Sequence, residues 1–318
     1  MADVLCFGDL LIDFVPTESG RSFADLPSFK PAPGGAAANV AVGLVRLGVS
    51  SAFMGKVGDD AFGHLLADIL EHVGVVVTPI RFEKRARTAL AFVTLTADGE
   101  RDFLFYRHPS ADMLFMREEL DLAAIHAAKV FHFDSISLAA SQSRATALFA
   151  ADEAARAGKL ISYDVNLRLQ LWDSEADARS GIFEGLRRAN IVKLSDSELE
   201  FMTGEPLPGN IRSQLWHDGM KLAVLSLGDR GCVAITERSE IIVPSILVKA
   251  VDTTGAGDGF VAGLLSGIAK NPKVLDDDHA LAELCRFANA VGAITTTARG
   301  AIPSLPTVSQ VEAILAAQ

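Results

Sequence analysis

Residues 252–268 read DTTGAGDGFVAGLLSGI, a glycine-rich turn between two acidic residues that runs directly into an apolar stretch. Gly255 and Gly257 permit backbone conformations that are closed to residues with a Cβ, so successive N–H groups can converge on one anion. Asp258 would repel that anion, which favours a role as the base for an attacking alcohol. The alternative is a turn that only caps a helix, with Asp258 at the positive end of the helix dipole.

The helix expected after this turn is apolar around its whole circumference. Gly259, Gly263 and Gly267 recur every four residues on one face, and apolar side chains occupy the remaining positions. Such a helix is predicted to be buried and closely packed, which would hold its N-terminus rigidly.

Short apolar runs alternate with helical patterns along most of the chain. The runs that predict strands are residues 4–14, 52–55, 129–133, 160–164, 191–194 and 221–226. The patterns that predict helices are residues 36–47, 62–72, 142–157, 195–203 and 280–297. This alternation predicts an α/β fold with a mainly parallel central sheet, helices on both faces, and ligands at the carboxyl ends of the strands.

Two segments, residues 15–33 and 86–108, interrupt the alternation. Within the second, the runs 88–93 and 103–106 flank Asp98-Gly99, which is typical of a β-hairpin. We expect these segments to form a small antiparallel lid that keeps water away from a phosphoryl group. A plain hairpin at the edge of the sheet is the alternative.

Composition limits the class of protein. The 318 residues favour one large domain over residues 1–318, and 49% apolar residues can fill its core. A net charge of −11 without a Lys/Arg block argues against nucleic acid or a membrane surface as the main partner. The three widely spaced cysteines indicate neither disulfides nor zinc. With no signal-peptide pattern and no apolar run of ~18 residues, we expect a cytoplasmic protein.

A second glycine motif, PGGAAAN at residues 33–39, opens an amphipathic helix. Gly34 and Gly35 can bring bare backbone against a ligand, and Asn39 offers a donor and an acceptor suited to a sugar hydroxyl. Asn39 could equally cap the helix. Upstream, Asp9 and Asp13 are four residues apart, which would place both on one face of a strand, where carboxylates can bind neighbouring hydroxyls. A solvent-facing strand end is the competing interpretation.

The segments PGGAAANVAVGLVRLG and DTTGAGDGF resemble the two signatures of the ribokinase-like (PfkB) carbohydrate kinase family, and they occur in the same order. Other segments, among them FGDLLIDFVPT and SYDVNLRLQLW, are similar to the fructokinases of that family along essentially the whole chain. The resemblance implies a ribokinase-like three-layer sandwich with a β lid. It also implies transfer of the γ-phosphoryl group of ATP to O6 of D-fructose, which gives fructose 6-phosphate.

The same resemblance assigns expected roles to individual residues. Asp258 would be the base, and the amides of Gly255, Ala256, Gly257 and Asp258 would form an anion hole. The sugar would be held by Asp13, Gly34, Gly35, Asn39, Arg107 and Arg168, the last from the DxNxR stretch 164–168. A surface ion pair is the alternative for each arginine. The nucleotide would be bound by Lys193, Ser226, Gly228, Gly231 and Asn289.

Two ion sites are also implied by the resemblance. Glu198 would belong to a Mg²⁺ network, although Ser195 followed by Glu198 is equally a helix capping box. A monovalent cation, K⁺, would be bound near Asp252, Thr254, Thr295, Ala298, Gly300 and Ser304.

Other functions and assemblies remain open at this level. A 2-keto-3-deoxygluconate kinase shares the DxNxR stretch, and Arg107 or Arg168 could bind the carboxylate of its substrate. An inactive fructokinase-like binding protein is disfavoured because the base and the glycines are present. A homodimer formed through the lid is expected from relatives, and Phe92, Phe103 and Phe105 could supply apolar contact unless they face the protein's own core.

Overall fold

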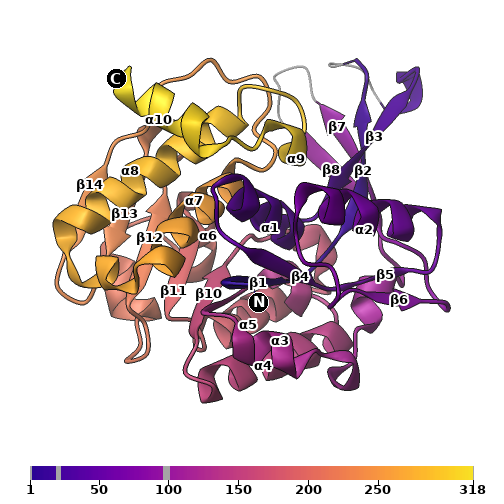
Figure 1. Ribbon diagram of the computed structural model, residues 1–318, viewed down its shortest axis with the longest axis horizontal. Coiled ribbons are helices and arrows are strands. Elements are labelled where there is room, and N and C mark those ends of the chain that lie inside the picture. Colours follow the sequence, from indigo (N-terminus) through magenta and orange to yellow (C-terminus); the bar gives the residue numbers. More distant parts are fainter. Residues whose placement is uncertain (1, 19–22, 96–100, 318) are drawn as a thin grey trace.

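The computed structural model describes residues 2–18, 23–95 and 101–317, without the side chains of residues 94, 95 and 101–103 (Figure 1). Its centre is an eight-stranded sheet. In spatial order the strands are β14 (Glu240–Val243), β13 (Cys232–Ile235), β12 (Leu222–Ser226), β11 (Ile191–Ser195), β10 (Leu160–Asp164), β9 (Val130–Asp134), β1 (Val4–Phe7) and β4 (Ser51–Met54). The strands from β12 to β4 pair in parallel, and β13 and β14 add an antiparallel edge, so the sheet is mainly parallel as predicted.

Helices cover both faces of this sheet because side chains along each strand alternate in direction. Val4 and Cys6 of β1 face one core, against α1 (Ala36–Arg46), α2 (Ala61–Val73), α7 (Ala256–Lys270), α8 (Asp278–Thr295) and α10 (Val308–Ala316). Leu5 and Phe7 face the other core, against α3 (Leu122–Ala127), α4 (Ser141–Arg156), α5 (Glu175–Leu186) and α6 (Asp196–Thr203). Figure 1 shows these helices as two layers with the sheet between them, the three-layer sandwich that was expected.

The glycine face of α7 packs against α8. A Cβ on Gly263 would come within 2.8 Å of the Ala288 backbone, and one on Gly267 within 2.4 Å of Leu284. The spacing of four therefore marks a close helix contact, which confirms that α7 is buried.

A smaller four-stranded sheet stands beside the main one, with the order β3 (Phe29–Gly34), β2 (Leu11–Pro16), β7 (Leu90–Leu95) and β8 (Arg101–Tyr106). The pairs β2–β3 and β7–β8 are antiparallel, whereas β2 and β7 run parallel. One face carries Leu11, Ala91 and Phe105, while Phe92 and Tyr106 pack on the other. We call this sheet the lid. The predicted Asp98-Gly99 turn lies outside the described residues.

The remaining elements are short. They comprise β5 (Lys56–Gly58), which pairs with β6 (Arg81–Glu83), and the helices α9 (Ala301–Ser304), η1 (Phe23–Asp25), η2 (Ala111–Leu114), η3 (Arg117–Glu119), η4 (Ser135–Leu138), η5 (Leu169–Leu171), η6 (Ile211–Leu215), η7 (Gly228–Arg230) and η8 (Pro272–Asp276). In the part of the chain that the structure describes, no helix is both long and apolar enough to cross a bilayer.

One strand prediction was wrong. The apolar run 4–14 is not a single strand: it divides at Gly8-Asp9 into β1 of the main sheet and β2 of the lid. Gly8 is tightly enclosed, since a Cβ there would lie 2.7 Å from Ala37. Asp9 consequently lies between the strands rather than on a strand face with Asp13.

Candidate active site

A cavity of about 460 Å³ lies where the carboxyl ends of the parallel strands meet the inner face of the lid and the N-terminus of α7. Its lining includes Leu11, Asp13 and Phe105 from the lid. From the main body it includes Asp9, Gly35, Asn39, Asp164, Asn166, Arg168, Lys193, Glu198, Ser226, Gly228, Gly255, Gly257 and Asp258. Most of the residues proposed from the sequence are therefore brought to one place.

The first turn of α7 presents Asp258 to this cavity. Its Oδ2 accepts a 2.7 Å hydrogen bond from Nδ2 of Asn39, which lies in the first turn of α1. Burial raises the pKa of the Asp258 carboxyl, and the hydrogen bond from Asn39 together with Arg168 and Lys193 opposes that rise. Asn39 thus orients the carboxylate, a contact that was not expected from the sequence.

Gly255 makes the turn before α7 possible. Its φ of 76° is left-handed, and a Cβ would approach Cβ of Ala301 to 2.5 Å. Gly257 lies against the Lys193 ammonium, because a Cβ there would be 3.2 Å from Nζ. The start of α7 therefore places backbone N–H groups, the helix dipole and a lysine around one point, an arrangement suited to a phosphoryl oxygen.

Lys193 projects from β11 and pairs with Asp164 at the end of β10, with Nζ 3.1 Å from Oδ1. Burial would lower the pKa of Lys193, but Asp164, Glu198 and Asp258 outweigh burial and raise the pKa to about 12. The side chain is therefore a fixed positive charge at neutral pH.

Glu198 makes the capping box of α6, with Oε2 accepting from the Ser195 amide at 2.7 Å. Its Oε1 accepts from the Leu167 amide at 2.9 Å and so ties α6 to the loop 164–168. Burial would raise the pKa of Glu198, but Lys193 and the two backbone amides lower it. Each carboxylate oxygen already has a backbone partner, so Glu198 fits a network around hydrated Mg²⁺ better than direct coordination. Among the described residues, no cluster of three or more metal-binding side chains occurs.

Two acidic residues and two glycines, Asp9, Asp13, Gly34 and Gly35, lie where the lid meets the main body. Oδ1 of Asp9 accepts from the Ala36 amide at 3.1 Å, and burial raises the pKa of Asp9 to about 6 against the opposing charge of Arg107. Gly34 is required because a Cβ there would lie 2.2 Å from Oδ2 of Asp13. Gly35 has φ 111° and packs on the carbonyl of Asp9. Gly34 itself supports Asp13 and is not among the lining residues.

Arg107 differs from its expected position. It is buried in an ion pair with Asp112 and does not line the main cavity. It lines a separate cavity of about 70 Å³ that shares Phe105 with the first. Arg168 does line the main cavity, and its Nη1 donates to the Leu167 carbonyl.

A second, more apolar cavity of about 330 Å³ adjoins the α7 turn and shares Ser226, Gly228 and Gly257 with the first. Gly231, Ala256 and Asn289 line it together with Ile246, Val248 and Phe260. Nδ2 of Asn289 donates to the carbonyls of Val243 and Pro244, so this amide nitrogen is already engaged by the protein's own backbone.

The loops expected to bind a monovalent cation do converge behind the α7 turn. The Asp252 carboxylate accepts from the amides of Thr254 at 2.7 Å and Gly300 at 2.9 Å, and the Ser304 hydroxyl donates to the Gly300 and Ala301 carbonyls. The Thr295 hydroxyl donates to the Val291 carbonyl at 2.8 Å. Ala298 lies in the same connection between α8 and α9.

Several lining residues had not been proposed as site residues. Asp164 and Asn166 belong to the DxNxR stretch, in which only the arginine had been considered. Asn166 has φ 34°, which is unusual for a residue other than glycine, and Nδ2 has no hydrogen-bond partner among the described residues. The spacing of the motif was a signal for both residues, whereas nothing in the sequence indicated that Phe105 would line the cavity.

Comparison with known proteins agrees with this geometry. The family model described as pfkB family carbohydrate kinase matches residues 1–308. The chain is 53% identical over 315 residues to a probable fructokinase-7 of Arabidopsis thaliana, covering 98% of this chain and 92% of that protein. A fructokinase from Xylella fastidiosa with bound ATP has a TM-score of 0.92 and 34% identity, covering 100% of this chain and 99% of the other.

A fructokinase from Vibrio cholerae in a form with fructose, ADP and calcium ion has a TM-score of 0.87 and 32% identity, with 99% of both chains covered. The match of the family model spans nearly the whole chain. It agrees with the two glycine turns that precede α1 and α7 and with the buried carboxylate of Asp258. The chain therefore belongs to the pfkB family of carbohydrate kinases and is a sugar kinase.

Proposed function

We propose that this protein is a fructokinase that transfers the γ-phosphoryl group of ATP to O6 of D-fructose. The observation that carries the proposal is the Asp258 carboxylate, oriented by Asn39, which lines the first cavity directly beside Gly257, a residue that the two cavities share. A sugar on the acidic side and a nucleotide on the apolar side would meet at the start of α7.

In the proposed reaction, Asp258 accepts the proton of the O6 hydroxyl as the O6–phosphorus bond forms and the bond to the β-phosphate oxygen of ATP breaks. The amides of residues 255–258 and the Lys193 ammonium offset the negative charge of the transferring group. The products are fructose 6-phosphate and ADP, and the proton remains on Asp258 until it is released to water.

Two ions would assist when bound. Mg²⁺ would neutralise the β- and γ-phosphates, with Glu198 organising the surrounding network and the loop 164–168. K⁺ would bind the carbonyls of the loop connecting α8 and α9, where Asp252 and Ser304 fix the backbone. Calcium and potassium are named in structures of the Vibrio cholerae fructokinase, which supports testing both kinds of ion.

The charge balance near the lid favours a neutral sugar over 2-keto-3-deoxygluconate. The charge of Arg107 is already matched by Asp112 and Asp9, both buried beside it. A substrate carboxylate would add a negative charge next to Asp9 and Asp13. Of the two basic side chains that line the cavity in the described part of the chain, Lys193 is already paired with Asp164, which leaves Arg168 to offset that charge.

The test is ATP consumption against fructose, ribose, 2-keto-3-deoxygluconate and fructose 6-phosphate, with product identified by mass and NMR. We expect fructose to give the highest kcat/KM and fructose 6-phosphate as the product. Preference for 2-keto-3-deoxygluconate would overturn the sugar assignment, and sugar binding without turnover would instead identify an inactive binding protein.

We further propose that two copies associate through the outer face of the lid. Leu104 and Tyr106 are 47% and 58% exposed on β8, an unusual position for two large apolar side chains. Phe105 faces the cavity and Phe92 packs in the lid's own aromatic cluster, while the Phe103 side chain lies outside the described residues. Sedimentation of wild type and Leu104→Lys would test this; an unchanged monomer for both would contradict it.

A further inference from the structure

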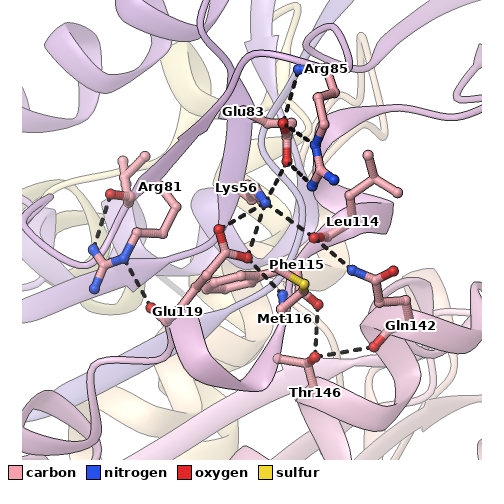
Figure 2. Close-up of polar contacts among 11 residues, drawn as sticks. Lys56, Arg81, Glu83, Arg85, Leu114, Phe115, Met116, Glu119, Gln142 and Thr146 are labelled. Carbon is pink, nitrogen blue, oxygen red and sulfur yellow. Dashed lines mark hydrogen bonds and ion pairs between the residues drawn. The ribbon is translucent and has the colours of Figure 1, made fainter.

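A buried lysine lies where the lid joins the main body. Lys56, the first residue of β5, is 2% exposed, and its Nζ lies 2.7 Å from Oε2 of Glu83, 2.9 Å from Oε1 of Glu119 and 3.1 Å from the Leu114 carbonyl. Figure 2 shows the ammonium enclosed between these three groups. We call Lys56, Glu83, Leu114 and Glu119 the lid-root cluster.

The partners of Lys56 come from the two ends of one hairpin. The chain enters the β7–β8 hairpin from β6, which ends at Glu83, and leaves it through the segment 107–119, which contains Leu114 and Glu119. We call the segment from Glu83 to the start of β7 the incoming root of the hairpin and residues 107–119 the outgoing root. The Lys56 ammonium therefore binds both roots. The roots also touch directly, because the Ala111 amide donates to the Arg87 carbonyl at 2.9 Å.

Further contacts hold both carboxylates in place. Glu83 accepts from Nε and Nη2 of Arg85, and these bonds, followed by the one from Lys56, lower the pKa of Glu83 well below its usual range. Glu119 also accepts from the Met116 amide at 2.8 Å, and Arg81 donates to its backbone carbonyl at 2.9 Å (Figure 2). Without Lys56, the buried Glu83 carboxylate and the half-buried Glu119 carboxylate would face each other without the cation between them, which should loosen the contact between the two roots.

The outgoing root leads directly to the sugar side of the cavity. Phe105 lines the cavity, and Arg107 pairs with Asp112, which lies between β8 and Glu119 in the chain. Arg107 in turn opposes the rise in the pKa of Asp9, another lining residue. The second, more apolar cavity, where the nucleotide is proposed to bind, is lined by no described residue of either root. A shift of the roots would therefore alter the sugar side and spare the nucleotide side.

We propose that Lys56 is a positioning residue for sugar binding: by fixing both roots of the lid hairpin at one buried ammonium, it holds Phe105 in the lining of the acceptor pocket and keeps Arg107 paired with Asp112 and close to Asp9. This inference rests on the proposed location of the sugar between the lid and Asp258. It does not require that the sugar be fructose.

The experiment compares wild type with Lys56→Met, Lys56→Arg and Glu119→Gln, using the best sugar substrate of the wild-type enzyme. Because small displacements of a binding group cost affinity steeply, Lys56→Met should raise the sugar KM by about tenfold or more, while kcat and the ATP KM stay within about threefold. Lys56→Arg should recover part of the sugar KM. Hydrogen exchange of the ligand-free protein should quicken in residues 84–92 and 104–119.

Leu281→Ala is the matched control for lost stability, since Leu281 is fully buried in α8, away from the lid. It should lower Tm without a selective rise in the sugar KM. If Lys56→Met leaves the sugar KM within about twofold of wild type, or raises both KM values equally, the proposal is wrong.

Glu119→Gln keeps Lys56 and Glu83 and serves if Lys56→Met does not fold. Faster exchange of residues 107–119 with a raised sugar KM would support the proposal, and no change in either would overturn it. If the wild-type enzyme phosphorylates no sugar, the proposed function is wrong. The role of Lys56 is still tested in that case, because hydrogen exchange of the ligand-free protein reports whether Lys56 holds the two roots together.

Discussion

Nδ2 of Asn39 donates a 2.7 Å hydrogen bond to Oδ2 of Asp258, a residue 219 positions later in the chain. The two residues lie in the first turns of α1 and α7, each of which follows a glycine with positive φ. Oδ1 of Asn39 is buried without a partner among the described residues, which is an unsatisfied acceptor on a residue that lines the main cavity. The bond joins the two glycine motifs into a single site.

Replacement of Asp258 by alanine tests its role as the base. Asp258→Ala should lower kcat by ~10²–10⁴, the usual effect of losing a general base, while the sugar dissociation constant changes little. Steady-state kinetics and calorimetric titration of sugar would measure the two effects. Normal turnover in this variant would refute the assignment.

Asn39→Ala should shift the pH dependence of kcat. The hydrogen bond from Asn39 opposes the rise that burial causes in the pKa of Asp258, so its loss should raise that pKa further. In the proposed reaction the carboxylate is the active form, so the acid limb of the kcat profile should move to higher pH. Profiles measured at saturating sugar would separate this shift from lost sugar affinity. An acid limb at the wild-type position would contradict the proposed contact.

The fold was largely predictable because hydrophobic periodicity and glycine spacing are local. Helices near residues 62–72, 142–157 and 280–297 occur as α2, α4 and α8, and the glycines of α7 meet α8 as their spacing indicated. The antiparallel strands β13 and β14 were missed. The run 4–14 was misread because the change of sheet at Gly8-Asp9 depends on tertiary packing against Ala37.

The site was predictable where a motif carries both residue type and backbone shape, as in the turn 255–258. Contacts between residues that are far apart in the sequence could not be predicted in this way. Nothing local to Asn39 indicates that its amide meets Asp258, 219 residues later. Asp112 is only five residues from Arg107, but their pairing depends on how the chain turns after β8. The Lys56 contacts with Glu83 and Glu119 are of the same kind, since they depend on where a hairpin rejoins the main body.

The buried pair of Arg107 and Asp112 should stabilise the outgoing root of the lid hairpin, residues 107–119. Both side chains are 7% exposed, so removing one partner leaves a buried charge unpaired. Arg107→Met is expected to lower the free energy of unfolding by about 3–5 kcal/mol, measured by urea denaturation. The double variant Arg107→Met with Asp112→Leu should lose less than the single variant. A larger loss in the double variant would show that the charge on Asp112 needs no partner.

Gly255 and Gly48 allow the turn before α7 to be tested with a matched control. Their φ values are 76° and 74°, but a Cβ on Gly48 meets nothing within 4 Å, whereas one on Gly255 would lie 2.5 Å from Cβ of Ala301. Gly48→Ala should therefore cost only the left-handed strain, about 1–2 kcal/mol of unfolding free energy, with kcat unchanged.

Gly255→Ala carries the same strain and must also displace α9 or the start of α7. We expect a larger loss of stability and a fall in kcat of about tenfold or more, because the amides proposed to face the phosphoryl group would move with the turn. Urea denaturation and steady-state kinetics of both variants would measure this. Equal kcat values for the two alanine variants would mean that the geometry of this turn does not limit phosphoryl transfer.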